Sequence, residues 1–433
     1  MSFEPVFDTD KCTSPHRQPQ PLPAPCGKPA GHRTRNGQDG RGSGPGRGWP
    51  GPRSGAGRLG RTPPPSPGGP VTYAHPLDGV DLRPRVQQAL EAHLARQREV
   101  LAELGEPMGP LVDAVAELLA GGKRLRAAFL YWGWRALGGP DDDAAVRAAS
   151  SMEVFQAAAL LHDDVMDNSD LRRGRPTAHR AFAATHARYG WNGDPARFGH
   201  AAAILAGDLC LNWTDEIFST SGLPQEALER ARPEFDRMRT QLMGGQFLDM
   251  LEGALGWGEL GYAERLERSR RVIRYKSAKY SVEQPLLIGA RAAGADEATL
   301  GALSRYGTSL GEAFQLRDDV LGVFGDPEHT GKPAGDDLRE GKHTALVAHT
   351  LELADPDGVE LLAASLGDPD LDDTTVEQCR RLIESSGALA RTEEMIDAGA
   401  ASARAALAEA QGLTDDGRAA LDGLVAICTD RQT

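Results

Sequence analysis

The sequence predicts an all-α fold, a large antiparallel helical bundle, from three observations. From about Leu82 to the C-terminus, apolar residues recur at intervals of three and four, and Ala, Leu, Glu and Arg dominate. Runs of β-branched residues, which indicate strands, are few in the same region. Several of the periodic segments are long, and long helices joined by short connections pack as antiparallel neighbours.

The expected helices follow one another with few interruptions. In chain order they are 82–104, 109–119, 124–137, 144–168, 196–218, 225–252, 262–292, 296–322 and 341–353. Glycine and proline fall between these segments, as at Gly121-Gly122 and Gly138-Gly139-Pro140, and indicate the connections. No repeat of fixed period divides the chain.

Residues 1–74 differ from the rest, and we expect them to be a disordered, Pro/Gly/Arg-rich N-terminal extension to a folded domain at 75–433. The extension is basic, whereas the whole chain has a formal net charge of −14, so the folded part is strongly acidic. An acidic body argues against nucleic acid as a partner. The basic tail is interpreted as a solvated extension or as the product of a start codon placed too far upstream; contact with RNA or an anionic membrane surface is the alternative.

The sequence contains no apolar run long enough to span a membrane and no apolar core of a secretion signal. Its five cysteines are scattered, and no pair of them has the spacing of metal ligands. These features predict a cytoplasmic protein with reduced thiols.

Two aspartate clusters, each at the end of an apolar helical segment, are the most informative motifs. The first consists of Asp163, Asp164 and Asp167, and the second of Asp318 and Asp319. Two unit charges about 4 Å apart repel by about 4 kcal/mol at an effective dielectric constant of about 20. A divalent cation removes that repulsion, and oxygen ligands without Cys or His suit Mg²⁺. The alternative, a charged helix end facing water, would favour neighbouring lysines, which the first cluster lacks.

Basic residues at two places indicate sites for phosphate groups. Arg172 and Arg173 closely follow the first aspartate cluster, and one guanidinium group can bind two phosphate oxygens at once. Lys123 and Arg126 lie in the run Gly121–Arg126 that opens a helix, where backbone N–H groups and the positive dipole end favour an anion. A diphosphate held between Mg²⁺ and arginine fits this combination, and surface arginines paired with nearby aspartates are the alternative.

Polar residues inside apolar helical segments must find partners or line a cavity. Residues of this kind are Lys276, Ser277, Gln315, Gln246 and Asp249, although a solvated helix face would also accommodate Lys276 and Ser277. A Gly-rich charged loop at 330–342 follows the second aspartate cluster. It is expected either to close over a bound anion or to be an ordinary surface loop.

Together these motifs resemble those of the trans-isoprenyl diphosphate synthases, the polyprenyl synthetase family, and in particular actinobacterial geranylgeranyl diphosphate synthases. The resemblance covers about residues 80–430, and the motifs occur in the family's order. His162 to Asp167 resembles the first aspartate-rich motif, and Phe314 to Asp319 resembles the second. Gly121 to Arg126 resembles the element that grips isopentenyl diphosphate, and the arginine pair and two loop lysines match as well.

The resemblance implies the isoprenoid synthase fold, a central substrate cavity, a homodimer and several Mg²⁺ ions per active site. The implied metal ligands are Asp163, Asp167 and Asp318, supported by Asp164 and Asp319. The residues implied to hold isopentenyl diphosphate are Lys123, Arg126, Gln156 and Arg173. Those implied to hold the allylic diphosphate are Arg172, Lys276, Lys332 and Lys342. Ser277 and Gln315 would face the developing carbocation.

The sequence departs from the family pattern at four positions. Gly322 stands where the second motif usually has its last aspartate, which predicts weaker metal binding on that side. Ala127 replaces a usual proline, Ser277 a usual threonine, and Gln156 a histidine found in many bacterial members. Glutamine can still form a hydrogen bond with a phosphate oxygen.

The expected activity is Mg²⁺-dependent condensation of isopentenyl diphosphate with an allylic diphosphate to a linear trans-polyprenyl diphosphate. Residues three apart on a helix lie about 4.5 Å apart along its axis, so Ala158, Phe155 and Met152 should line a product tunnel at increasing depth. Small Ala158 leaves the first level open and large Phe155 closes the second, which predicts geranylgeranyl diphosphate. Two alternatives stay open: a class I terpene cyclase, and a non-catalytic or regulatory subunit of a prenyl synthase.

Overall fold

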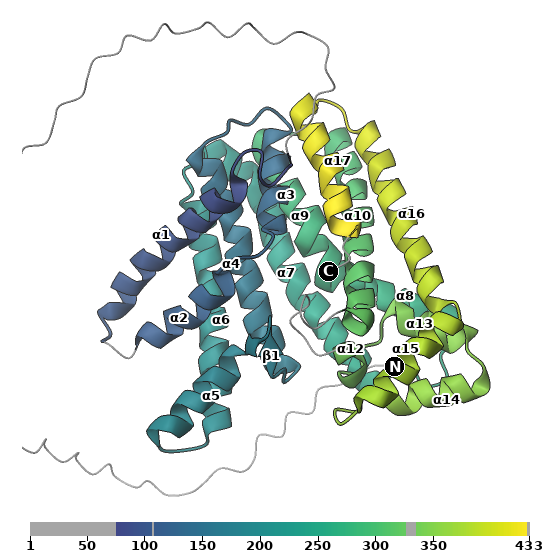
Figure 1. The fold of residues 1–433 in the computed structure, drawn as a ribbon. Helices are drawn as coiled ribbons and strands as arrows, with labels where there is room; N and C mark the ends of the chain where they lie inside the picture. The colour runs from purple at the N-terminus through teal and green to yellow at the C-terminus, as the bar shows by residue number, and fades with distance from the viewer. Residues whose placement is uncertain (1–74, 106–107, 326–334, 431–433) are drawn as a thin grey trace, which may run out of the picture. The chain divides into compact units, whose positions relative to one another are not determined.

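The structure is a computed structural model, and it describes residues 75–105, 108–325 and 335–430. Residues Pro70–Thr433 form one compact unit, and all of the described residues lie in it. Apart from one pair of two-residue strands, the regular elements of the described residues are helices. The all-α prediction is therefore confirmed (Figure 1).

In chain order, the described residues form the following helices and a single strand pair. They are α1 (Leu82–Ala102), α2 (Gly109–Leu119), α3 (Leu125–Arg135), α4 (Asp143–Met166), β1 (Leu171–Arg172), β2 (Arg175–Pro176), α5 (Ala178–Tyr189), α6 (Pro195–Ser219), α7 (Gln225–Leu255), α8 (Tyr262–Val272), η2 (Ile273–Glu283), α9 (Gln284–Ala293), α10 (Glu297–Phe324), α12 (Asp336–Arg339), α13 (Ala345–Leu353), α14 (Pro356–Ser365), α15 (Asp373–Ser385), α16 (Ala388–Glu409) and α17 (Asp415–Thr429).

Most predicted helices occur within a few residues of their expected bounds, and two differ for physical reasons. The helix expected at 341–353 begins at Ala345, because Gly341 has a φ of 71° and the Thr344 hydroxyl caps the helix by accepting from the backbone N–H of Val347 at 3.3 Å. The helix expected at 262–292 is continuous, but its middle part, η2, is a π-helix with wider turns. Helices α5, α12 and α14–α17 lie outside the segments predicted from the sequence.

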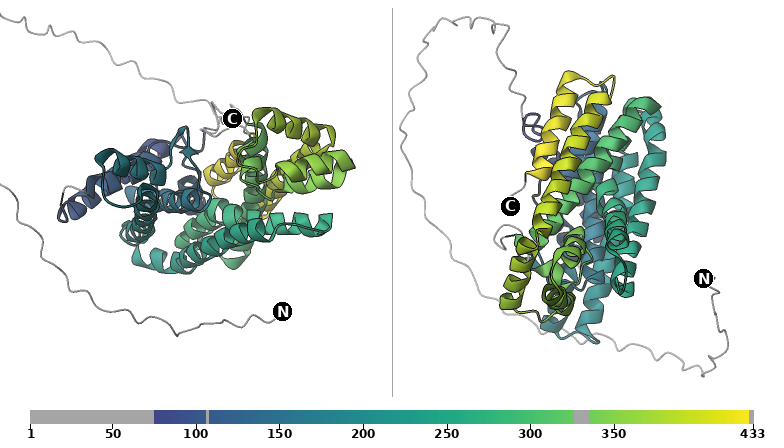
Figure 2. Two further views of the ribbon diagram at one scale, coloured as in Figure 1. Left: turned by 90° about the horizontal axis from the view of Figure 1, so that it is seen from below. Right: turned by 90° about the vertical axis from the view of Figure 1, so that its right-hand side faces the viewer.

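The long helices run side by side and form the body of the fold. In Figure 1, α3, α4, α7, α9 and α10 stand nearly upright, and the right-hand view of Figure 2 shows long helices aligned along the same direction. The most extensive packing joins α6 to α4 and α5, α10 to α16 and η2, and α9 to α3. The large antiparallel bundle predicted from the sequence is therefore present.

Helix α4 lies in the middle of this bundle, which explains its composition. Its residues from Ala145 to Ala158 are nearly all buried, so the helix is covered around its circumference rather than along one stripe. Asp142 caps its start by accepting from the backbone N–H of Ala145 at 2.9 Å. A helix surrounded by others keeps polar groups only where they have partners, so the aspartates at its C-terminal end need a chemical explanation.

A second, smaller core lies next to the end of α10. It gathers buried side chains of α12, α13, α14 and α15, including Leu338, Leu346, Leu362 and Ile383. In Figure 1 these helices sit at the lower end of the bundle, where β1 also lies, after the end of α4. The C-terminal ends of α4 and α10 therefore lie at the same end of the bundle.

Candidate active site

One lysine lies between the first aspartate cluster and Asp337, an aspartate of the segment after α10. The Lys342 Nζ atom lies 3.9 Å from an Asp167 carboxylate oxygen, and 3.6 Å from an oxygen of Asp337, which follows α10. Its closest contact is Glu340, at 2.5 Å. The Ser169 hydroxyl donates to Glu340 at 3.4 Å and ties the segment after α4 to the segment after α10. The structure thus brings together motifs that lie far apart in the sequence.

Asp163 lies at the centre of a polar network contributed by three helices. One of its oxygens accepts from Lys276 of η2 at 3.1 Å and from Gln246 of α7 at 2.8 Å. Lys276 also contacts Asp249 at 2.6 Å. Burial opposes ionisation of Asp163, but the positive charges of Lys276, Lys342 and Arg172 prevail and lower its pKa. Asp163 is therefore held ionised.

The approach of η2 to α7 depends on a residue without a side chain. A Cβ atom at Gly245 would lie 2.4 Å from the backbone carbonyl carbon of Tyr275 and 2.5 Å from the backbone nitrogen of Lys276. Glycine permits this contact because it has no Cβ. The neighbouring Gln246 and Lys276 can then both reach Asp163.

A short hairpin places the two arginines. Strands β1 and β2 pair antiparallel, and the two residues between them, Arg173 and Gly174, have φ values of 54° and 73°. Positive φ at both central residues is the geometry of a tight hairpin turn. The hairpin returns Arg172 to α4, where its Nε atom donates to Asp164 at 2.9 Å and its Nη2 lies 3.5 Å from Asp163.

Two carboxyl groups of the clusters are poorly compensated. Burial and the charge of Asp163 raise the pKa of Asp167 to about 6. Burial, followed by the charges of Asp337 and Asp318, raises the pKa of Asp319 to about 8. Burial and neighbouring carboxylates together oppose ionisation of these two groups, which is the condition that a cation relieves.

The residues of this site fit a hard divalent cation. The candidate ligands are carboxylate oxygens only, the donor set that Mg²⁺ prefers. Asp319 is 6% exposed, and its Oδ2 atom is buried with no hydrogen-bond partner among the described residues. Within those residues, no three carboxylate, imidazole or thiol groups are already arranged around a common metal position. Arg172 and Lys276 occupy the oxygens of Asp164 and Asp163 instead.

Arg173 and the loop before α3 form a second basic region. A Cβ atom at Gly122 would lie 3.8 Å from Arg173 Nη2, and Arg173 Nη1 donates to the carbonyl of Leu118 at 3.3 Å. Desolvation, and then the charges of Arg124 and Arg172, lower the pKa of Arg173. Clustered guanidinium groups of this kind favour a bound anion.

Arg126 and Gln156, both expected at this second region, meet through a tyrosine. Arg126 Nη2 donates to the Tyr280 hydroxyl at 2.9 Å and to the Ser281 hydroxyl at 2.7 Å, and the Arg126 guanidinium lies 4.6 Å from the Tyr280 ring centre. The Tyr280 hydroxyl donates to Gln156 at 2.7 Å. The edge of the same tyrosine ring meets Phe155, with ring centres 6.2 Å apart.

The start of α3 differs from the prediction of free backbone donors. The helix begins at Leu125, so Lys123 precedes it, exposed, and does not share a helix face with Arg126. The backbone N–H of Ala127 donates to Glu153 at 3.1 Å, and that carboxylate also pairs with the buried Arg124 at 3.2 Å. The Glu153 carboxylate therefore already accepts from one of the backbone N–H groups at the start of α3.

The remaining predicted residues are placed as follows. Gln315 donates to Asp319 at 2.8 Å, and Ser277 is partly buried on η2. Met152, Phe155 and Ala158 are buried on α4. Lys332 lies outside the described residues.

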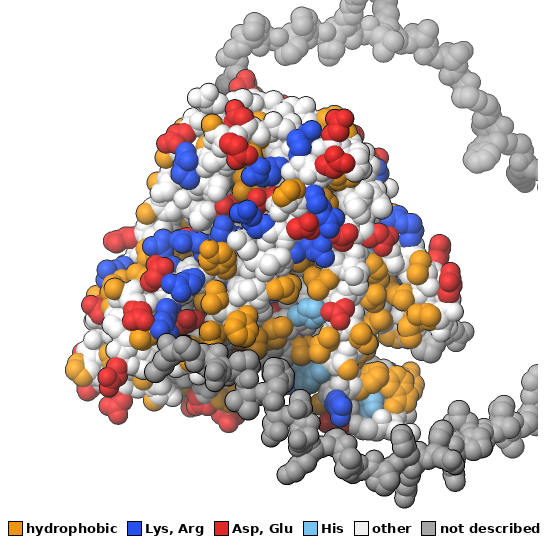
Figure 3. All heavy atoms as spheres, turned by 180° about the vertical axis from the view of Figure 1, so that it is seen from behind, with side chains coloured by type: hydrophobic (Ala, Val, Ile, Leu, Met, Phe, Trp, Pro, Cys, Tyr) orange, Lys and Arg blue, Asp and Glu red, His pale blue; other side chains and the backbone are white. Residues whose placement is uncertain are grey.

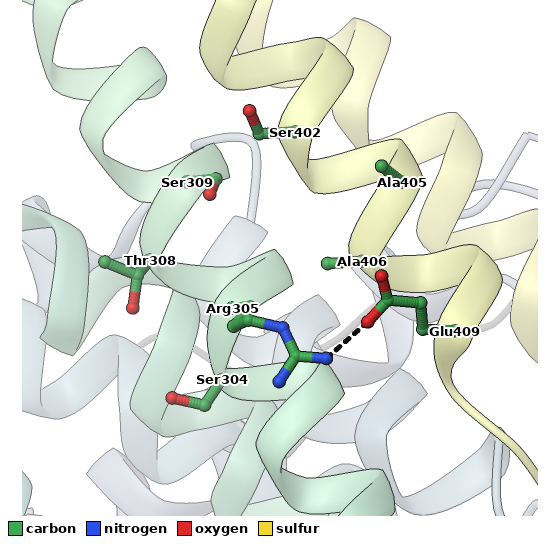
Figure 4. Close-up of a pocket in the computed structure, with 8 residues that line it drawn as sticks. All are labelled: Ser304, Arg305, Thr308, Ser309, Ser402, Ala405, Ala406 and Glu409. Carbon is green, nitrogen blue, oxygen red and sulfur yellow. Dashed lines mark hydrogen bonds and ion pairs between the residues drawn. The ribbon is translucent and has the colours of Figure 1, made fainter.

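A hollow elsewhere on the surface does not belong to this site. Between α10 and α16, a groove of about 470 Å³ is lined by small and polar residues, with an exposed Arg305–Glu409 ion pair at 2.5 Å across it (Figure 4). Its residue Ser304 is fourteen positions before Asp318 on α10, about 21 Å along the helix. The groove holds no cluster of carboxylates, so the chemistry is placed at the aspartates.

The site contains residues to which the sequence assigns no role there. Asp249 and Gln246 are marked in the sequence only as polar residues in apolar surroundings, and that signal is correct. Tyr280 and Glu340 have no signal of their own, because an isolated tyrosine or a loop glutamate is common on protein surfaces.

The comparisons with known proteins agree with this geometry. Residues 110–383 match the family model described as polyprenyl synthetase. The chain belongs to this family. It is a prenyltransferase, and its helical bundle is the all-α isoprenoid synthase fold. No helix of the described residues is both long enough and apolar enough to cross a bilayer.

Similar proteins differ in the product that their names state. The chain is 35% identical to a geranylgeranyl diphosphate synthase of Sulfolobus acidocaldarius over 57% of this chain and 68% of that protein. It is 30% identical to a nonaprenyl diphosphate synthase of Mycobacterium tuberculosis over 82% and 97%. A crystal structure of geranylgeranyl pyrophosphate synthase from Corynebacterium glutamicum, complexed with isoprenyl diphosphate and magnesium, has a TM-score of 0.77 and 38% identity, covering 82% of this chain and all of that one.

Proposed function

We propose that this prenyltransferase condenses isopentenyl diphosphate with an allylic diphosphate in a Mg²⁺-dependent reaction and makes geranylgeranyl diphosphate. The observation that carries the proposal is that Lys342 lies between Asp167 of the first cluster and Asp337 of the segment after α10, with Arg172 and Lys276 on the first cluster. Carboxylates for a metal and cations for a diphosphate are thereby combined in one site. The similar Corynebacterium protein was crystallised with an isoprenyl diphosphate and magnesium.

The proposed metal ligands are Asp163, Asp167 and Asp318, with Asp164 and Asp319 in support. When bound, Mg²⁺ neutralises the leaving diphosphate and favours rupture of the allylic C–O bond. The oxygens of Asp163 that face Lys276 and Arg172 must exchange partners for this, because those cations hold them in the described state.

The allylic diphosphate is proposed to lie against Arg172, Lys276, Lys332 and Lys342. Arg172 presents a planar guanidinium to phosphate oxygens, and the lysines present point charges. Ser277 and Gln315 supply oxygen dipoles toward the carbon that becomes positive. The double bond of isopentenyl diphosphate forms the new C–C bond, pyrophosphate leaves with the electrons of the C–O bond, and pyrophosphate accepts the proton lost from the isopentenyl unit.

Isopentenyl diphosphate is proposed to bind at Lys123, Arg126, Gln156 and Arg173. Tyr280 supports this set, because its hydroxyl accepts from Arg126 and donates to Gln156. These contacts fix both side chains before the substrate arrives, which lowers the entropic cost of binding.

The product length is proposed to be set on α4. Ala158, Phe155 and Met152 follow one another at a spacing of three residues and are each at most 1% exposed. Phe155 packs in a T-shaped arrangement with Tyr280 and is proposed to form the floor at the second level. A growing prenyl chain that stops at Phe155 gives geranylgeranyl diphosphate in this proposal, rather than the longer products named for some relatives.

A homodimer is proposed from one apolar surface. Exposed hydrophobic side chains occur on neighbouring turns of α6 (Ile204 and Leu205) and α7 (Met243, Phe247 and Met250). Figure 3 shows that hydrophobic side chains gather across the lower half of the rear face. Exposed apolar side chains on two helices favour a protein partner, and a second copy of the chain is proposed. Phe247→Asp is expected to give a monomer in sedimentation velocity, while Val100→Asp, at another exposed apolar residue, leaves the dimer intact.

The synthase domain is proposed to comprise residues 75–433, with residues 1–74 as an extension outside it. A cytoplasmic location is proposed, and the free, buried thiols of Cys210 and Cys379 in the described part of the chain are compatible with a reducing compartment.

One assay tests the function. Purified protein is incubated with Mg²⁺, isopentenyl diphosphate and dimethylallyl, geranyl or farnesyl diphosphate, and the products are identified after removal of phosphate. A linear C20 alcohol supports the proposal. A cyclic hydrocarbon made from the allylic substrate alone indicates a terpene cyclase, and inactivity that a partner protein relieves indicates a non-catalytic subunit.

A further inference from the structure

The second aspartate cluster lacks a side chain at the position where its third carboxylate is expected. On α10, Gly322 follows Asp319 by three residues and Asp318 by four, so all three positions share one helix face. A carboxylate in the space next to the Gly322 Cα atom would therefore lie beside the two aspartates. Glycine itself offers nothing to a cation.

Another residue fills that space. A Cβ atom built on Gly322 would lie 2.0 Å from Asp337 Oδ2, 2.5 Å from its Cγ and 3.0 Å from its Oδ1. The whole carboxylate of Asp337 thus occupies the volume in which a side chain of residue 322 would begin. Any residue other than glycine at 322 would collide with it.

Asp337 is held in this position by the packing of α12. Leu338 is completely buried in the smaller core, and its carbonyl accepts from the backbone N–H of Gly367 at 2.8 Å. The carbonyl of Asp337 accepts from the backbone N–H of Lys342 at 3.0 Å. The backbone that carries Asp337 is therefore fixed beside α10.

The surroundings of Asp337 match those of a cation site. It shares the Lys342 ammonium with Asp167 of the first cluster, at 3.6 and 3.9 Å. One turn before Gly322, Asp319 is more than nine-tenths buried, and its Oδ2 atom has no hydrogen-bond partner among the described residues.

We propose that Asp337 supplies the third carboxylate of the second cluster, and that Gly322 is required because it leaves room for this carboxylate. The inference rests on the proposed Mg²⁺-dependent function and refines its metal site. Taken from the sequence alone, Gly322 predicts weaker metal binding. The proposal reverses that expectation, since the missing carboxylate comes from α12 instead of α10.

Metal binding without catalysis tests the proposal directly. Mg²⁺ is titrated calorimetrically into the full chain in the presence of inorganic pyrophosphate. Asp337→Asn is expected to weaken Mg²⁺ binding about tenfold or more, the loss typical of a group that supports a metal. Asp373→Asn is the matched control, because Asp373 is a fully exposed carboxylate that pairs with Arg339 of the same short helix at 3.1 Å. This control is expected to bind Mg²⁺ as the wild type does.

A pair of substitutions separates lost charge from lost shape. Gly322→Asp alone places two carboxylates in one space and is expected to lower the melting temperature. Combined with Asp337→Gly it moves the carboxylate to α10 and is expected to restore both the melting temperature and Mg²⁺ affinity to within a few-fold of wild type.

The outcomes are distinguishable. Unchanged Mg²⁺ affinity in Asp337→Asn, or a wild type that binds no Mg²⁺ with pyrophosphate, overturns the proposal. Mg²⁺ binding that depends on Asp337, in a protein that elongates no allylic diphosphate, supports the proposal and contradicts the proposed function.

Discussion

Replacing Phe155 by alanine tests the product tunnel most directly, because the residue is proposed to close its second level. Phe155 is 1% exposed on α4, and Met152 is the next residue in line. Three residues of helix correspond to about 4.5 Å, which is close to the length of one isoprene unit. We therefore expect Phe155→Ala to shift the main product from C20 to C25, with longer products where Met152 allows.

The same substitution has a calculable cost in stability. Removing a buried phenylalanine side chain destabilises a protein by about 3–5 kcal/mol when the cavity stays empty. Loss of the edge-to-face contact with Tyr280 is part of this cost, at about 0.5–1.5 kcal/mol. A growing prenyl chain that fills the cavity should recover part of it, so a long allylic diphosphate is expected to raise the melting temperature of the variant more than that of the wild type.

The assay is product analysis by chromatography with farnesyl diphosphate as the allylic substrate. Phe235→Ala is the matched control: Phe235 is completely buried and stacks on Phe218 with ring centres 4.3 Å apart, between α6 and α7. It should lose comparable stability and keep the wild-type product. If Phe155→Ala is folded and active but its product stays C20, residues of α4 do not set the length.

Two further predictions concern the charges of the site. Lys276→Met removes the cation that Asp163 and Asp249 share. We expect the free energy of unfolding, measured by urea titration, to fall by about 3–5 kcal/mol, because two carboxylates then face each other unpaired. Added Mg²⁺ should recover part of this loss. Lys279→Met, which removes a lysine paired with Glu283 on the same helix, is its control and should not gain from Mg²⁺. Mg²⁺ binding should also release protons between pH 6 and 8: the raised pKa values of Asp167 (about 6) and Asp319 (about 8) mean that both carry protons below these pH values, and a cation must displace them. The apparent affinity for Mg²⁺ should therefore rise with pH over this window. Calorimetry in buffers of different ionisation enthalpy measures the number of protons released. An affinity that does not change with pH would contradict the reasoning.

The helices could be predicted from the sequence where burial is periodic and the ends are marked. Helix α2 occurs at its expected bounds, and α4 and α10 each carry an Asp cap that accepts from a backbone N–H. The short strand pair at 171–176 was not predicted, because it contains too few residues for any alternation to appear. It depends on positive φ at Arg173, which no propensity of arginine indicates.

The sequence predicts those residues of the candidate site that belong to a recognisable motif. Asp163 contacts both Arg172 and Lys276, and the sequence marks all three by their motifs. Asp337 lay within the predicted Gly-rich loop but had no assigned role. Its position against Gly322 depends on how α12 packs, and that contact joins two segments whose local sequences carry no sign of each other.

The wide turns of η2 affect how sequences in this region should be compared. An α-helix advances by about 100° per residue, and a π-helix advances by less. A helical wheel drawn with the usual angle from Tyr262 to Ala293 therefore loses phase within η2 and assigns residues of α9 to the wrong side. A redesign that treats this stretch as one regular helix will therefore choose substitutions in α9 for the wrong side of the helix.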